Sequence, residues 1–351
     1  MAAPYFLGSS FIITSIILIC LVFIILTHNR SVYKHKKINF FYFLIFIYST
    51  LSLLVNFSFG LTNDYIYVQY GNFLRVIMIL ITLNFSEILL KDYLLGIRVG
   101  IIIGCLSIII SSYFKLDLVL LSNGLSSEYQ TRFSGFYLNP NYAGTILALS
   151  YNLFQQKKYR ITIIETAILF TSIFFTFSYT AIVILLVGLY KKNRFLFLLA
   201  PVFSVIYIII FWDTFNFSQS RYKKLKFLID YLNGKGELND LFTGRIELWT
   251  QGLLAISEKP LTGNGFGYMS SFIKTYSDVG IHNGYIEILG DFGVPIGLII
   301  LVALFNVLKP KKLVGFSISI ALITGHGLIY TIPIFILLTI NNLDEFFIKK
   351  I

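Results

Sequence analysis

Long apolar stretches separated by short polar connections run through almost the whole chain, and this pattern restricts the fold more than any other feature. A helix that crosses the hydrocarbon core of a bilayer needs about 18 to 20 mostly apolar residues, and we count about eleven such stretches, some of them shorter. They lie at residues 10–27, 38–56, 72–90, 93–112, 139–154, 161–177, 178–190, 195–212, 284–307, 312–329 and 330–347. Hydrophobic residues make up 56% of the chain and charged residues 13%, which is far from the composition of a soluble domain. The sequence therefore predicts an all-α polytopic membrane protein, in which residues 1–351 form a single integral membrane domain.

One connection is much longer than the others, at residues 213–283. Cytoplasmic loops retain Lys and Arg, and most of the 28 basic residues fall in alternate short connections if the N-terminus lies outside. We therefore expect residues 191–194 in the cytoplasm and residues 213–283 outside. A basic run at residues 218–240 is interpreted either as a helix that touches headgroups or as a cationic rim for an anionic substrate. The first apolar stretch lacks a basic leader and a small-residue cleavage site, so we expect it to be retained as an anchor.

The formal net charge of +11 would suggest a nucleic-acid partner in a soluble protein. Here most of the positive charge falls in the predicted inner loops, where it faces anionic headgroups, so no nucleic acid is expected. Cys20 and Cys105 both lie within apolar stretches and have no partner pattern, so neither a disulfide framework nor a metal site is indicated.

A polar, glycine-rich segment at the end of the long loop carries the most informative motifs. Residues 243–293 read TGRIELWTQGLLAISEKPLTGNGFGYMSSFIKTYSDVGIHNGYIEILGDFG. Its first apolar residues recur at helical spacing, at Ile246, Trp249, Leu253 and Ile256, and predict a helix that lies on the membrane surface or packs on the bundle. No strand precedes the glycines at 263–267, so a nucleotide site is not indicated. We interpret them as a tight turn that lets the backbone approach the bilayer surface or a lipid-linked substrate.

Arg245 stands at the start of this predicted helix, where the helix dipole disfavours a cation and the first backbone N–H groups lack partners. An anion bound there would satisfy both the free amides and the guanidinium, which offers a planar, bidentate pair of donors. The pattern therefore predicts a phosphate ligand. The alternatives are an ion pair with Glu247 or Glu258, or contact with lipid headgroups.

His282 is the second candidate, because it lies just before an apolar helix expected to start near Gly284. The dipole at a helix N-terminus disfavours imidazolium, so a neutral imidazole that accepts a proton is expected at neutral pH. A general base needs that state. The alternative is that His282 and Asn283 only cap the helix.

An earlier block, RFSGFYLNPNYAG at residues 132–144, lies where an outer loop meets the fifth apolar stretch. Asn139 and Pro140 have the form of a helix cap followed by a first helical residue, which gives Asn139 and Asn141 a structural explanation. Arg132 has no adjacent acid and so needs an anionic partner from elsewhere. Arg75, near the outer end of the third stretch, is a further candidate of the same kind.

Together, the blocks at 132–144 and 243–293 resemble the O-antigen ligase and O-antigen polymerase family of bacterial envelope glycosyltransferases. The resemblance implies a fold similar to that of the polytopic GT-C glycosyltransferases, a location in the bacterial inner membrane, and an active site that faces the periplasm or exterior. The donor would be an undecaprenyl-diphosphate-linked oligosaccharide within the membrane lipid. The outer loops lack an Asp-x-Asp motif, and the resemblance implies a metal-independent, inverting transfer, so no metal or cofactor is expected.

The resemblance also implies roles for individual residues. It makes Arg132 and Arg245 diphosphate ligands and His282 the base that deprotonates the acceptor sugar hydroxyl. The further substrate-binding candidates are Arg75, Asn139, Asn141, Gly244, Trp249 and Asn283. Many members of the family carry a Ser-Arg pair where this chain reads Ser178-Tyr179-Thr180, so a phosphate contact made by that arginine would be missing or supplied by Arg75.

Polymerase and ligase share these motifs and differ in the acceptor, which is another lipid-linked repeat unit for a polymerase and lipid A-core or another terminal acceptor for a ligase. The heavy use of Ile, Phe, Tyr, Lys and Asn, with 35 Phe and 23 Tyr, resembles that of polysaccharide-locus polymerases. This resemblance favours a polymerase, with a flippase and a chain-length regulator as partners. A flippase or transporter is a third alternative. It predicts charges within the bundle, of which Glu87 and Glu165 are the main examples in this sequence.

Overall fold

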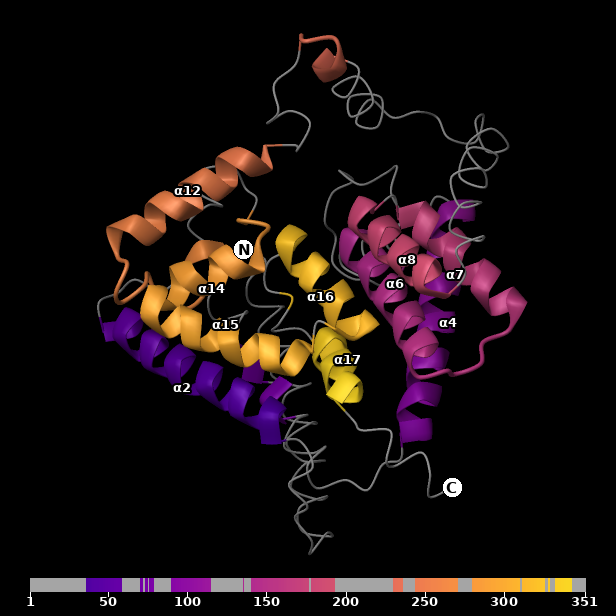
Figure 1. Ribbon diagram of the computed structural model, residues 1–351, viewed down its shortest axis with the longest axis horizontal. Coiled ribbons are helices and arrows are strands. Elements are labelled where there is room, and N and C mark those ends of the chain that lie inside the picture. Colours follow the sequence, from indigo (N-terminus) through magenta and orange to yellow (C-terminus); the bar gives the residue numbers. More distant parts are fainter. Residues whose placement is uncertain are drawn as a thin grey trace, which may run out of the picture. The chain divides into compact units, whose positions relative to one another are not determined.

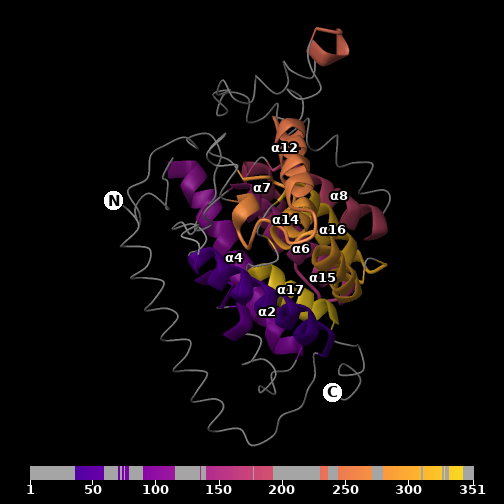
Figure 2. The same cartoon turned by 90° about the vertical axis from the view of Figure 1, so that its left-hand side faces the viewer.

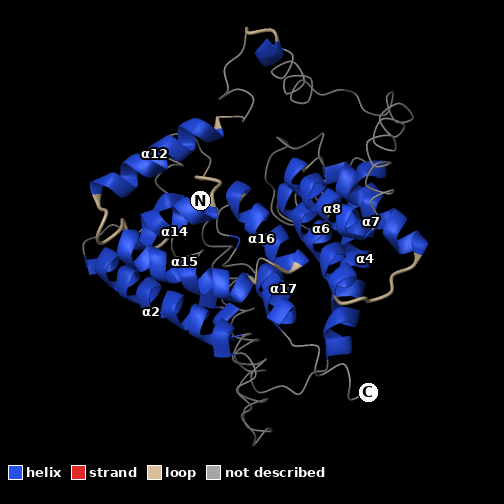
Figure 3. Ribbon diagram, viewed as in Figure 1, coloured by secondary structure: helices blue, strands red, loops and turns tan. Residues whose placement is uncertain are grey.

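In the computed structural model, every regular element in the described part of the chain is a helix, as Figure 3 shows. The structure describes residues 36–58, 70–71, 73–74, 76–78, 90–114, 135, 140–176, 178–192, 230–235, 244–270, 280–309, 311–325, 328 and 332–342. The predicted all-α class is confirmed for these residues. Among them, one helical segment, Leu94–Phe114, is long and apolar enough to cross a membrane. Shorter apolar helical segments lie at Phe40–Ser52, Ile163–Thr176, Tyr179–Tyr190, Val294–Leu308 and Leu313–Thr324, so the predicted count of about eleven spans stays a prediction.

The chain divides into two compact units. One contains Met1–Tyr93, Leu248–Lys311 and Leu322–Ile351, and the other contains Leu94–Glu247 and Lys312–Ala321. We call them the first and the second unit. The predicted single membrane domain with an outer loop at 213–283 stays a prediction.

The second unit is built around a central, almost fully buried helix, α6 (Pro140–Gln156), which packs on α7 (Ile163–Thr176) and α8 (Tyr179–Lys192). It also contains most of α4 (Leu90–Phe114) and the first part of α16 (Leu313–Thr324). Asn152 is fully buried on α6, and its Nδ2 donates to the carbonyl oxygen of Ile184 at 2.9 Å and to Oγ of Ser317 at 2.8 Å. A buried amide therefore links three helices through hydrogen bonds.

Helix starts in the second unit follow local sequence signals. Pro140 is the first residue of α6, as the sequence predicts. Thr162 and Glu165 form a capping box at the start of α7, in which Oε2 of Glu165 accepts from the Thr162 N–H at 2.7 Å and Oγ1 of Thr162 accepts from the Glu165 N–H at 3.1 Å. The other carboxylate oxygen of Glu165 accepts from Nε of Arg98 at 2.6 Å. Glu165 thus belongs to a helix start and an ion pair, which corrects its interpretation as a charge inside the bundle.

The first unit places α15 (Val294–Leu308) against α2 (Lys36–Ser58), α14 (Gly284–Phe292) and α17 (Ile332–Asn342), as Figure 1 shows. The apolar stretch predicted at 284–307 is two helices and not one. Gly293 separates them with φ 77° and ψ 164°, and Pro295 lies in the first turn of α15. A left-handed glycine followed by proline ends one helix and starts the next.

Most of helix α12 (Arg245–Glu258) belongs to the first unit. It lies on one side of α14 in Figure 1, and the turned view of Figure 2 shows the same arrangement. The loop at 259–270 connects α12 to the region of α14. These elements contain the motifs singled out in the sequence between residues 244 and 293.

Candidate active site

Helix α12 begins with Gly244 and Arg245. Gly244 has φ 75° while a Cβ at this position would meet open space, so glycine is required here by backbone conformation and not by crowding. Arg245 is half-buried, and burial lowers the pKa of its guanidinium. Within the described part of the chain no carboxylate pairs with it, so neither Glu247 nor Glu258 neutralises its charge there. This favours the interpretation in which an external anion is the partner of Arg245.

The helix predicted from the spacing is present, and its packed side includes small residues. Gly252 and Ala255 are buried and Trp249 is half-buried, whereas Leu253 is 57% exposed. Whether the exposed side lies on the membrane surface stays a prediction. A Cβ at Gly252 would meet side-chain atoms of Ile281 and Ile286, so glycine at this position lets α12 approach these two residues closely.

A small apolar cluster joins α12 to the segment that carries His282. Its core consists of Ala255, Met269 and Ile281, and its partly buried members are Leu248, Trp249, Tyr268 and Ile286. Trp249, which lies one turn after Arg245 on α12, therefore packs in the same cluster as the residue directly before His282. Its Nε1 is buried and has no hydrogen-bond acceptor among the described residues.

The residues His282 and Asn283 have separate roles at the start of α14. Oδ1 of Asn283 accepts from the N–H groups of Tyr285 at 3.0 Å and Ile286 at 3.1 Å, so Asn283 is the N-cap. His282 is half-buried and has φ 49°, in the left-handed region that L-residues rarely occupy. This conformation costs about 1 to 3 kcal/mol and is found preferentially at functional sites. Asn283 thus provides the side-chain cap of α14, and His282 is not needed for it.

The glycine-rich loop forms the predicted turn and bonds to the end of α14. Its approach to the bilayer surface or a lipid-linked substrate stays a prediction. The N–H of Asn264 donates to the carbonyl oxygen of Gly290 at 2.8 Å, and the N–H of Gly265 donates to that of Asp291 at 2.9 Å. Nδ2 of Asn264 also donates to the carbonyl oxygen of Ala255 at 2.9 Å. The loop therefore satisfies carbonyl groups in the last turn of α14, which no longer have partners within the helix.

Two acidic residues of α14 are buried against this loop, and the sequence analysis missed both. Asp291 is 1% exposed, and its Oδ2 and Oδ1 accept from the N–H groups of Gly267 at 2.8 Å and Met269 at 2.9 Å. Glu287 is fully buried, and its Oε1 accepts from Oγ of Ser270 at 2.6 Å. Two acids four residues apart in an otherwise apolar helix were the signal that could have revealed them. Both acids bond to the loop. This favours a structural role for them over a role in a transport path.

Gly263 is the loop position at which a side chain is expected to be least tolerated. It has φ 71°, and a Cβ would lie 2.6 Å from the carbonyl carbon of Phe292. We expect Gly263→Ala to lower the free energy of unfolding by at least about 2 kcal/mol, from backbone strain and crowding together. Gly234→Ala is the matched control, because Gly234 has φ 70° with open space around it. Its expected cost is about 1 kcal/mol. Thermal unfolding of both variants in detergent measures the difference, and equal stability would show that the close approach at Gly263 is unimportant.

The remaining predicted site residues lie elsewhere. Asn141 is in the first turn of α6 in the second unit, half-buried, and Tyr179 is the first residue of α8 and 64% exposed. Ser178, directly before Tyr179, caps α8, and its Oγ accepts from the N–H of Ala181 at 3.3 Å. Arg75, Arg132 and Asn139 lie outside the described residues.

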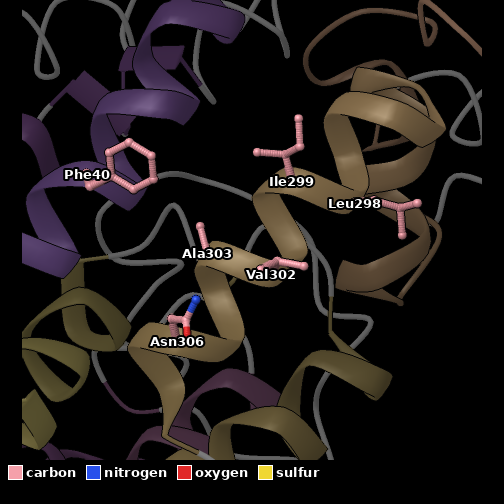
Figure 4. Close-up of a pocket in the computed structure, with 6 residues that line it drawn as sticks. All are labelled: Phe40, Leu298, Ile299, Val302, Ala303 and Asn306. Atoms are coloured by element: carbon pink, nitrogen blue, oxygen red, sulfur yellow. The ribbon is translucent and has the colours of Figure 1, made fainter.

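A groove in the described part of the first unit contains none of the predicted site residues. It has a volume of about 520 Å³ and lies on α2 and α15, as Figure 4 shows. Its lining consists of Phe40, Leu298, Ile299, Val302, Ala303 and Asn306. These groups offer no acid, base or cation for catalysis. Among the described residues, no group of three or more His, Cys, Asp or Glu side chains could hold a metal ion.

Comparison with protein families identifies the segment that contains these motifs. Residues 164–302 match the O-antigen ligase family. The match covers less than half of the chain. It includes all of α7 but its first residue, α8, α12, α14 and most of α15, and with them Gly244, Arg245, Trp249, His282 and Asn283. It confirms the resemblance to O-antigen ligases and polymerases drawn from the motifs. No curated protein and no solved structure matches the chain. With the apolar helices, the match indicates a membrane protein with glycosyltransferase-type activity.

Proposed function

We propose that the protein is a polysaccharide polymerase that transfers glycan from an undecaprenyl-diphosphate carrier to a sugar hydroxyl of another lipid-linked repeat unit. The observation that carries this proposal lies within the family match. Arg245 starts α12 without a carboxylate partner among the described residues, and the same helix packs beside the residue that precedes His282. The candidate anion-binding group and the candidate base thus both lie within the matched residues 164–302.

The proposed reaction divides the work between these two groups. The imidazole of His282 accepts the proton of the acceptor hydroxyl, whose oxygen attacks the anomeric carbon of the donor sugar. The bond between that carbon and the phosphate oxygen breaks with inversion, and the diphosphate leaves on its lipid. Arg245 neutralises the negative charge that develops on this leaving group, with Arg132 as a second cation and Arg75 as a third candidate. Fixed arginines would make a metal ion unnecessary for this step.

The further parts of the proposal concern binding and surroundings. Trp249, Gly244, Asn139, Asn141 and Asn283 would contribute to the substrate site, Asn283 chiefly through the position of α14. The chain would form one domain of the bacterial inner membrane with residues 213–283 on the periplasmic or outer side. A flippase would deliver the donor to that side, and a chain-length regulator would act on the growing polymer.

Ligation is the second candidate, because the matching family is described as O-antigen ligase. The two activities separate in a reaction that contains one type of acceptor at a time. Purified protein that is given only undecaprenyl-diphosphate-linked repeat units should form a ladder of longer lipid-linked glycans if it is a polymerase. A protein that forms no ladder, and transfers glycan only when lipid A-core is added, would be a ligase.

Both candidates require the long loop to lie outside the cytoplasm, where the flipped donor presents its sugar. We expect reporter fusions after residues 191–194 to report the cytoplasm and fusions near Gly234 to report the exterior. Alkaline phosphatase and a cytoplasm-dependent fluorescent protein provide complementary signals at each position. A cytoplasmic signal near Gly234 would exclude Arg245 and His282 from this chemistry.

A further inference from the structure

Asp291 lies at one end of a series of contacts that leads to His282. Its two carboxylate oxygens hold the N–H groups of Gly267 and Met269, at 2.8 and 2.9 Å. The side chain of Met269 fills the space above Gly290 and also reaches Gly252 of α12, since a Cβ added at either glycine would meet it. Met269 and Ile281 belong to the same buried cluster, and the residue after Ile281 is His282.

The side chains that form this series are buried. Asp291, Met269 and Ile281 are each no more than 1% exposed, and Gly252 leaves no free volume between α12 and Ile281. Close-packed interiors transmit displacements because side chains have little room to relax. At the end of the series, His282 holds a backbone conformation that persists only when its surroundings enforce it.

We propose that Asp291 is a positioning residue for the transfer reaction, which fixes the imidazole of His282 through Met269 and Ile281. The inference rests on the proposed function in that His282 acts on the substrate, whereas Asp291 does not touch it. Asp291 acts as a double acceptor: each of its oxygens binds one backbone N–H. An asparagine would keep one acceptor and turn an NH₂ group toward the other N–H, so one end of the loop would be released.

Glu287 provides a matched control in the same helix. It is as buried as Asp291, but its partner Ser270 is a hydroxyl that can donate or accept. Glu287→Gln therefore keeps a bond to Ser270, and Asp291→Asn loses one of its two bonds to the loop. The two variants make the same chemical change one helical turn apart.

The test measures turnover and local structure separately. Turnover is assayed with the protein in nanodiscs. The donor is undecaprenyl-diphosphate-linked glycan extracted from cells that lack this protein. The chain has two tryptophans, so Trp212→Phe leaves Trp249 as a single fluorescent reporter inside the Met269–Ile281 cluster. Asp291→Asn should lower kcat by about tenfold or more while KM for the donor changes less than about threefold, because positioning the base affects the transition state more than ground-state binding. Trp249 emission should shift to the red and become more accessible to acrylamide.

Glu287→Gln should retain kcat within about threefold of the parent and leave the Trp249 emission unchanged. Met269→Ala tests the next step in the series without altering the carboxylate, and should also lower kcat at constant KM. It decides the question if Asp291→Asn does not fold. Parental kcat in Asp291→Asn or in Met269→Ala would overturn the proposal, and so would an equal loss in Glu287→Gln. If His282→Ala were fully active, the proposed function would fail, and the Trp249 signal would still report whether Asp291 orders the cluster.

Discussion

Removal of the imidazole of His282 is expected to lower turnover by roughly 100- to 10,000-fold, which is the usual contribution of a positioned general base. Binding of the lipid-linked donor should stay close to that of the parent protein, because the base acts on the acceptor proton in the transition state and contributes little to holding the diphosphate. Addition of Mg²⁺ should not restore activity. The parent protein should work in excess chelator.

The choice of substitution matters because His282 has φ 49°. Alanine at such a position adds backbone strain, whereas asparagine tolerates the left-handed region. His282→Asn is therefore the more informative variant, since it removes the base and keeps the backbone preference. His35→Ala, in the predicted first inner loop, is the control for loss of a histidine. Normal elongation by His282→Asn at equal expression would show that His282 is not the general base. Strict dependence of the parent protein on a divalent ion would require a different mechanism.

Replacement of Arg245 by lysine is expected to lower kcat/KM by about tenfold to 100-fold although the charge is kept. An ammonium group is a point charge, whereas guanidinium donates two parallel hydrogen bonds to a phosphate. Arg245 also begins α12, so its geometry is fixed relative to the first free amides of that helix.

The control for Arg245→Lys is the same change at Arg160, an exposed arginine outside the predicted site. Arg160→Lys should have parental activity. The measurement is the rate of glycan elongation at subsaturating donor, with membrane insertion checked by the amount of purified protein. If the Arg245 and Arg160 variants were equally active, Arg245 would be a headgroup contact and the diphosphate would need another ligand.

Several elements could be predicted because their signals are local. The stretches at 139–154, 161–177 and 178–190 correspond to α6, α7 and α8, and the division between the last two lies at Ser178, which caps α8. Pro140 starts α6 where a proline at the first helical position is expected. In each case a few consecutive residues determine the helix boundary.

The errors concern features that depend on packing between distant segments. Hydrophobicity does not register the break in the stretch at 284–307, which Gly293 and Pro295 mark locally, and the loop at 259–270 bonds to the backbone there. The spacing of Trp249 and Leu253 does not reveal that Gly252 lies where α12 packs closely on Ile281 and Ile286. Glu287 and Asp291 were overlooked since their partners, Ser270 and the amides of residues 267 and 269, are polar groups from outside the helix.

The sequence indicates which residue types the candidate site contains, but not the contacts that hold them in place. Arg245 and His282 follow from charge and position at helix starts, and both lie in the segment that matches the O-antigen ligase family. The left-handed backbone of His282 and the division of roles with Asn283 required coordinates.

The bonds between the glycine-rich loop and α14 have a consequence for how such proteins can recombine. The N–H of Val294 donates to the carbonyl oxygen of Pro260 at 2.7 Å, and the loop amides and Asp291 complete the connection, so neither motif retains its shape without the other. In a chimera that takes the loop from a relative but keeps its own α14, the hydrogen-bonding groups of the loop and the helix would no longer match. We therefore expect the stretch from Gly244 to Val294 to be the smallest segment that can be exchanged between relatives as a unit. Chimeras that work should have their crossover points at its two ends.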